Sequence, residues 1–258
     1  MTRAATIATA DSVPVVVGAI MGVAMIAWLG MFWMHGIRPG YAQYALVWSA
    51  MTIGMMTPSA VPMVVTYMRV SVRAQAHLSP LWCVAAFIAA YVILWVAFGV
   101  AAGVLQAGMH ALYLVDDHMQ LAIRPLGAAL LIAAALYQLT PLKHVCVSKC
   151  RSPLGFLLGR FREGYSGSFI LGLHHGAFCI GCCWLLMLLA WVGGMMNIAW
   201  MAALSLLVIA EKCLPQADWL VNAAGGVLLV AGLALLLTSG SDDFLALDAL
   251  SSLCHALL

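Results

Sequence analysis

Residues 168–191 read SFILGLHHGAFCIGCCWLLMLLAW, and this stretch decides the fold class of the chain. It contains no Asp, Glu, Lys or Arg. A helix of about 20 mainly apolar residues is long enough to cross the hydrocarbon core of a bilayer. The stretch therefore predicts a transmembrane helix, and its two histidines and three cysteines are the feature that calls for a function.

The composition of the whole chain predicts the same class of protein. Of its 258 residues, 65% are hydrophobic and 8% are charged, whereas about 25% of residues are charged in ordinary soluble domains. Backbone groups in lipid must be satisfied within the segment that crosses it, which favours helices. We therefore expect an all-α, polytopic transmembrane bundle in contact with the lipid bilayer. The net charge of +2 is too small to indicate a nucleic-acid partner.

Seven apolar runs are long enough to be interpreted as spans. They cover residues 13–34, 44–68, 80–107, 121–139, 168–191, 196–213 and 219–237. The first run is longer than the apolar region of a signal peptide, so we expect it to be retained as a helix. The bundle then forms a single domain, residues 1–240, and residues 241–258 form a short tail outside the membrane.

Prolines and glycines predict how two of these spans pack. Pro58 and Pro62 each remove an amide donor from the second span, so we expect that helix to be broken at mid-membrane depth. Gly172 and Gly176 form a small-x-x-x-small pair in the fifth span. Such a pair allows a neighbouring helix to approach closely.

Basic residues predict the orientation of the bundle. With seven spans, Arg38 and Arg124 fall on one side of the membrane. The other side holds the N terminus and the remaining basic residues, namely Arg3, Arg69, Arg73, Lys143, Lys149, Arg151, Arg160, Arg162 and Lys212. Cytoplasmic loops are enriched in Lys and Arg. We therefore place the N terminus inside and the C terminus outside.

The histidines and cysteines of the fifth span form a candidate metal site. His175, Cys179 and Cys182 lie on one narrow helical face, because residues three and four apart are neighbours on a helix. Cys183 and His174 lie to either side of that face. Thiolate and imidazole are ligands of Cu(I) and Zn(II). The alternative is that these side chains only pack helices together or bond to the backbone.

Further candidate ligands lie in the second and sixth spans. Met55, Met56 and Met63 are close to the expected break. Thioethers bind Cu(I), although methionine also fills irregular apolar gaps. Glu211 and Cys213 stand at the end of the sixth span and complete this set of candidates. Alternatively, ionisable residues at such a boundary only extend their charges towards water.

A second pair of cysteines follows the fourth span. Cys146 and Cys150 are one helical turn apart, so their sulfur atoms would face the same way. Lys149 and Arg151 are close in sequence, and neighbouring cations favour the thiolate form. The pair could receive metal on the cytoplasmic side, or it could belong to an amphipathic connector in which the cysteines have no role.

Four segments carry a resemblance to a known family. They are MMTPSAVPM (residues 55–63), YQLTPLK (137–143), CIGCCW (179–184) and EK (211–212). Together they resemble a bacterial family of predicted metal-binding integral membrane proteins of unknown function, over residues 48–215. The resemblance implies metal binding and a location in the bacterial inner membrane. The matching positions are Met55, Met56, Pro58, Pro62, Met63, Gln138, Lys143, Cys146, Cys150, Cys179, Cys182, Cys183, Glu211 and Lys212.

Three functions are compatible with these residues. The favoured one is binding of a soft metal, copper before zinc, for metal transfer, transport or metalloprotein assembly with a metallochaperone or membrane-complex partner. The second is a membrane thiol–disulfide oxidoreductase or metalloenzyme, because Cys179 and Cys182 also form a C-x-x-C motif. The third is a structural or assembly subunit. No nucleotide-binding or hydrolase motif is present, so an enzyme is not the favoured class.

Overall fold

The computed structural model describes residues 2–34, 40–75, 77–115, 119–122, 124–195, 197–214 and 218–238. Within these ranges the chain is helical and contains no β-strand. The expected tail therefore lies outside the described residues. The helices are α1 (Thr2–Met34), α2 (Tyr41–Ala74), α3 (Pro80–Ala111), α4 (Arg124–Gln138), α5 (Pro141–Arg151), α6 (Pro153–Leu158), α7 (Gly164–Leu188), α8 (Ala190–Gly193), α9 (Ile198–Cys213) and α10 (Asp218–Thr238).

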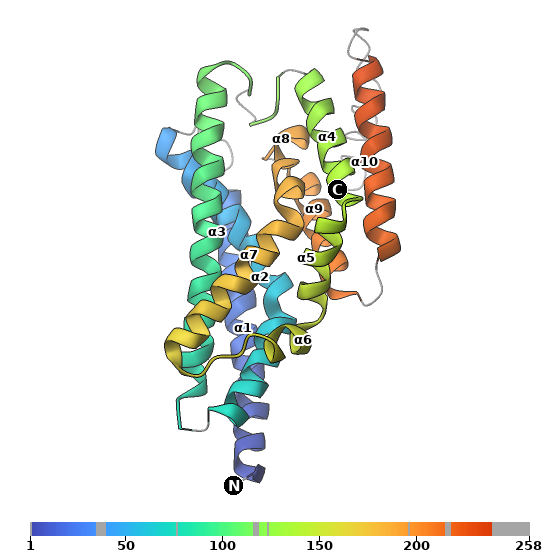
Figure 1. The fold of residues 1–258 in the computed structure, drawn as a ribbon. Coiled ribbons are helices and arrows are strands. Elements are labelled where there is room, and N and C mark those ends of the chain that lie inside the picture. The colour runs from blue at the N-terminus through green and yellow to red at the C-terminus, as the bar shows by residue number, and fades with distance from the viewer. Residues whose placement is uncertain are drawn as a thin grey trace.

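Helix α7 lies in the middle of the bundle. It packs against α3 on one side and against the shorter α5 on the other, while α2 packs against α1 and α3 (Figure 1). Helix α10 pairs with α4 at the far side (Figure 1). This arrangement brings parts of α2, α5, α7 and α9 together around the cysteines of α7.

Fewer helices have the dimensions of a span than the sequence predicts. Four stretches are long and apolar enough to cross a membrane, and α4 with α5 makes a fifth if that pair, bent by 65°, counts as one span. The four stretches are Ser12–Met34, Pro80–Ala111, Gly164–Gly193 and Asp218–Thr238. The prediction of seven spans is therefore wrong for the described residues.

The short length of α9 and the polar content of α2 explain this difference. Helix α9 has 16 residues, which give a length of about 24 Å at 1.5 Å per residue, less than the roughly 30 Å of a hydrocarbon core. Helix α2 is long, but Thr52, Thr57 and Ser59 are buried in it. These polar residues, together with its prolines, reduce its apolar character, and its core-facing side contacts other helices instead of lipid.

The predicted break in the second span is wrong, because α2 runs as one helix through Pro58 and Pro62. Hydroxyl groups satisfy backbone carbonyls around the prolines. Thr57 Oγ1 donates to Ile53 O at 2.7 Å, and Met56 O accepts hydrogen bonds from Ser59 and from Tyr91 of α3. Tyr91 thus ties α2 to α3 beside Pro58, and α2 packs against both α1 and α3 as one continuous helix.

Glycines allow α7 to lie directly against α3, as the sequence predicts. A Cβ atom at Gly172 would collide with Phe87 and Ala90, and one at Gly176 would lie 2.8 Å from a methyl carbon of Leu94. Only residues without a side chain permit this close approach. The contact fixes the depth at which α7 presents its cysteines.

Candidate metal centre

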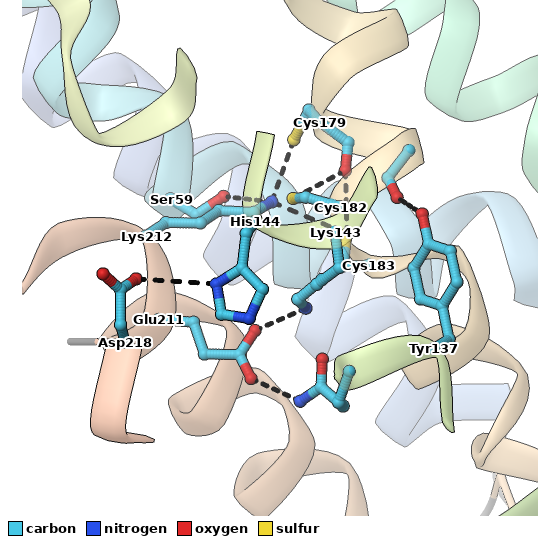
Figure 2. Close-up of polar contacts among 12 residues, drawn as sticks. Ser59, Tyr137, Lys143, His144, Cys179, Cys182, Cys183, Glu211, Lys212 and Asp218 are labelled. Atoms are coloured by element: carbon cyan, nitrogen blue, oxygen red, sulfur yellow. Dashed lines mark hydrogen bonds and ion pairs between the residues drawn. The ribbon is translucent and has the colours of Figure 1, made fainter. Parts of the chain in front are cut away.

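Three thiols of α7 are buried at the centre of the bundle. Cys179, Cys182 and Cys183 are each 1% exposed. The Sγ atoms of Cys182 and Cys183 both donate to the carbonyl oxygen of Cys179, at 3.1 and 3.0 Å (Figure 2). Cys182 and Cys183 therefore both bond to the backbone of their own helix.

A lysine from α9 points into this group of sulfur atoms. Lys212 Nζ lies 2.9 Å from Cys179 Sγ and 3.6 Å from Cys183 Sγ (Figure 2). Helix α2 contributes the other two acceptors, Met56 Sδ at 3.5 Å and Ser59 Oγ at 3.4 Å. An ammonium can only donate, and a neighbouring cation favours thiolate. The short contact between Lys212 Nζ and Cys179 Sγ fits a buried ammonium–thiolate pair.

Tyr91 of α3 contacts the same group of sulfur atoms from another side. Its hydroxyl lies 3.1 Å from Cys179 Sγ and donates to Met56 O at 2.9 Å. Met56 Sδ itself lies 3.6 Å from Cys183 Sγ. One tyrosine thus links α2, α3 and α7 at the sulfur atoms, which fixes their relative positions.

The cysteines of α5 reach the same place. The thiols of Cys179 and Cys182 are the neighbours that act on the thiol of Cys150. Cys146 Sγ lies against Gly181 of α7, where an added Cβ atom would be 3.1 Å away. Both α5 cysteines are buried. We use the name sulfur cluster for Cys150, Cys179, Cys182, Cys183 and Met56, with Cys146 at its edge.

A separate buried network holds α5 to α9. Lys143 Nζ lies 2.6 Å from Glu211 Oε2 (Figure 2). Gln138 Nε2 donates to Glu211 Oε1 at 2.6 Å. Arg151 Nε donates to the backbone oxygen of Glu211 at 2.7 Å. Both carboxylate oxygens of Glu211 are therefore engaged, and this candidate ligand faces Lys143 instead of the sulfur cluster.

The other predicted ligands differ in their position relative to the sulfur cluster. His175 is buried, and its ring stacks against those of Phe87 and Tyr91. His174 and Cys213 are exposed. Met63 is buried in a different apolar group with Val16, Tyr67 and Phe87. Met55 is buried in the main core.

The described residues contain no group of three or more His, Cys, Asp or Glu side chains that could hold a metal ion. The ammonium of Lys212 instead makes contacts with the sulfur atoms at distances of 2.9–3.6 Å. A metal ion held by these sulfurs therefore requires the lysine side chain to move aside.

Two important residues were not among the predicted ligands. Lys212 was placed at the membrane boundary, although it is only 5% exposed and faces the sulfur cluster. Tyr91 lies in a uniformly apolar run and carried no functional prediction. Charged residues inside apolar segments are rare and mark functional sites, so the position of Lys212 in an apolar helix was the available signal. Nothing in the local sequence of Tyr91 indicates its contact with Cys179.

The fold and this site define a class of protein: a helical bundle with four or five helices of membrane-spanning character around a buried cluster of thiols and a thioether. A family model described as PpoB2, copper chaperone, matches residues 45–235. The chain belongs to this family, and the match indicates a copper-related role. It agrees with the resemblance to a metal-related family. No curated protein and no solved structure matches the chain.

Proposed function

We propose that this chain binds Cu(I) as cargo in its sulfur cluster and passes it to a partner protein from within the membrane. One observation carries the proposal: soft sulfur atoms from α2, α5 and α7 converge in a buried place, and the nearby carboxylate of Glu211 is paired with Lys143. The family description as a copper chaperone supports the same metal.

The chemistry of the side chains favours copper over zinc. Thiolates and thioethers select Cu(I), whereas zinc in proteins is bound by mixtures of thiolate, imidazole and carboxylate. The imidazole of His175 is stacked among aromatic rings, and Glu211 is paired with Lys143. Met56, the one thioether in contact with a cluster thiol and with Lys212, adds a ligand that zinc does not prefer.

A transfer route follows from the order of the thiols. Cys146 lies against Gly181 of α7, Cys150 neighbours Cys179 and Cys182, and Cys179 lies beside Lys212. Adjacent thiols allow Cu(I) to move by stepwise ligand exchange without being released into water. We propose that copper enters on the α5 cysteines and that Cys179 and Cys183 hold it.

Basic residues support entry from the cytoplasmic side. The turn between α2 and α3 and the segment between α6 and α7 lie at the end of the bundle that also holds the N terminus (Figure 1). Arg69 and Arg73 end α2, and Arg160 and Arg162 follow α6. The bias towards Lys and Arg in cytoplasmic loops places this end inside. Helix α10 ends at the opposite end of the bundle (Figure 1).

The direct test is the copper content of the detergent-purified chain after loading with Cu(I). About one copper per chain is expected for two thiolates that share a Cu(I) ion. The Cys179→Ser, Cys182→Ser double variant should lose it. Cys83→Ser is the matched control, because Cys83 is also buried but contacts Gln75 instead of the cluster. Equal copper in the wild type and the double variant would refute the proposal.

The same thiols favour a second candidate, a thiol–disulfide oxidoreductase whose oxidant is a quinone or a disulfide of a partner protein. Cys150 is close to both Cys179 and Cys182, and either pair could lose two protons and two electrons to such an oxidant to form a disulfide. Free-thiol counts on the copper-free protein before and after quinone treatment distinguish the two functions. Loss of a pair of thiols without any copper binding would favour exchange.

A further inference from the structure

Among the residues that the structure describes, no carboxylate contacts the ammonium of Lys212. The neighbouring Glu211 is engaged by Lys143 and Gln138 through both of its oxygens. The contacts of Lys212 Nζ are two cysteine sulfurs, a methionine sulfur and the hydroxyl of Ser59. The positive charge of Lys212 is therefore balanced by the sulfur cluster itself.

Burial makes this charge count energetically important. Lys212 is 5% exposed, and Cys179 is 1% exposed. An unbalanced charge at such a place costs several kcal/mol, so the number of positive and negative charges around it must stay equal. One ammonium and one thiolate satisfy this condition in the metal-free protein.

We propose that Lys212 determines the charge selectivity of the site: its fixed positive charge makes the sulfur cluster accept a monovalent soft cation in preference to a divalent one. The inference rests on the proposed function and adds which oxidation state and which metals the site admits. Cu(I) and Ag(I) meet the requirement, whereas Zn(II) does not.

The binding step keeps the net charge of the site at zero. Before binding, the site holds the ammonium of Lys212, the thiolate of Cys179 and the thiol of Cys183. Cu(I) forms bonds to both sulfurs, the S–H bond of Cys183 breaks, and the proton passes to the thiolate of the carrier that releases the copper. Two thiolates then balance Cu(I) and the ammonium, and no atom changes oxidation state.

The lysine can leave the sulfur atoms without losing every partner. Its four-carbon side chain is flexible, and Ser59 Oγ already accepts from Nζ at 3.4 Å. Copper would replace the contacts of the ammonium with Cys179 and Met56, while the hydroxyl of Ser59 remains available to it. The ammonium of Lys212 then stays near the site, and the copper ion occupies its former position among the sulfur atoms.

A divalent ion bound by the same two thiolates leaves one positive charge unbalanced. A third thiolate would have to come from Cys182 or Cys150. The Cys182 thiol donates its proton to Cys179 O, so its ionisation would also break a buried hydrogen bond. The presence of Lys212 therefore makes the binding free energy of Zn(II) less favourable and has no such effect on Cu(I).

The test measures the affinities of Cu(I) and Zn(II) by competition with chelators for the wild type, Lys212→Met and Lys212→Arg. The Met variant removes the charge at similar length, and the Arg variant keeps it. We expect Lys212→Met to lose about a hundredfold or more in its preference for Cu(I) over Zn(II), the effect of one unbalanced buried charge. Lys212→Arg should keep most of that preference. Lys149→Met removes an exposed lysine of α5 and should leave it unchanged.

Circular dichroism and thermal unfolding of each variant separate a loss of selectivity from a failure to fold. An unchanged preference in folded Lys212→Met would overturn the inference and leave the proposed function intact. Equal losses in the Met and Arg variants would also overturn it, since shape and not charge would then decide. A wild type that binds no Cu(I) would instead refute the proposed function, and the inference with it.

Discussion

The two buried lysines of this chain differ in their partners. Lys143 is fully buried and lies 2.6 Å from a carboxylate oxygen of Glu211, with Gln138 on the other oxygen. Lys212 is nearly as buried, but its closest partner is the sulfur of Cys179 at 2.9 Å. In the Lys143–Glu211 pair both carboxylate oxygens are already engaged, so this pair holds α5 to α9 and has no free ligand atom. A thiolate can exchange its partner for a soft metal, so the second lysine marks the site.

Substitution of each lysine in turn tests this contrast. The largest effect on stability is expected for Lys143. Lys143→Met leaves the Glu211 carboxylate buried without its cation, which should cost about 3–5 kcal/mol in the free energy of unfolding. Lys212→Met should cost only about 1 kcal/mol. Without the lysine, Cys179 can take up a proton and become a neutral thiol, whereas the carboxyl group of Glu211 stays ionised near neutral pH.

Thermal and denaturant unfolding in detergent measure both losses. A Lys143→Met, Glu211→Gln double variant is the control, because it removes both charges of the pair and should regain much of the lost stability. Equal losses for the two single variants would contradict the distinction between a structural and a functional lysine.

A smaller effect is expected from the methionine beside Lys212. Met56 Sδ lies within 3.6 Å of Cys183 Sγ and within 3.5 Å of Lys212 Nζ. Met56→Leu keeps the volume but removes the thioether, and it should weaken Cu(I) binding about tenfold. Met63→Leu is the matched control, because Met63 is equally buried but packs in the other apolar group. Similar Cu(I) affinities for the two variants would exclude Met56 as a ligand.

Much of the fold could be predicted because the chain is so apolar. Helices α1, α3, α7 and α10 appear where the apolar runs predict them, and Gly172 and Gly176 form the expected close contact with α3. The number of spans and the break in α2 were wrong. The cause of the second error is tertiary: α2 packs against both α1 and α3, and Tyr91 of α3 donates to Met56 O beside Pro58.

The candidate site was predictable only where one helix decides the geometry. Helical spacing placed Cys179 near Cys182 and placed Cys146 on the same face as Cys150. Spacing could not rank Met55, Met56 and Met63, which are all buried. The direction of Lys212 depends on how the end of α9 packs against α2 and α7, and no pattern within α9 contains that information.

X-ray absorption at the copper edge of the Cu(I)-loaded chain tests the central claim most directly, because it identifies the atoms bound to the metal. A first shell of sulfur alone, lost in the Cys179→Ser, Cys182→Ser variant, is the result that we predict. A shell with nitrogen or oxygen from His175 or Glu211 would contradict a copper site built from the sulfur cluster.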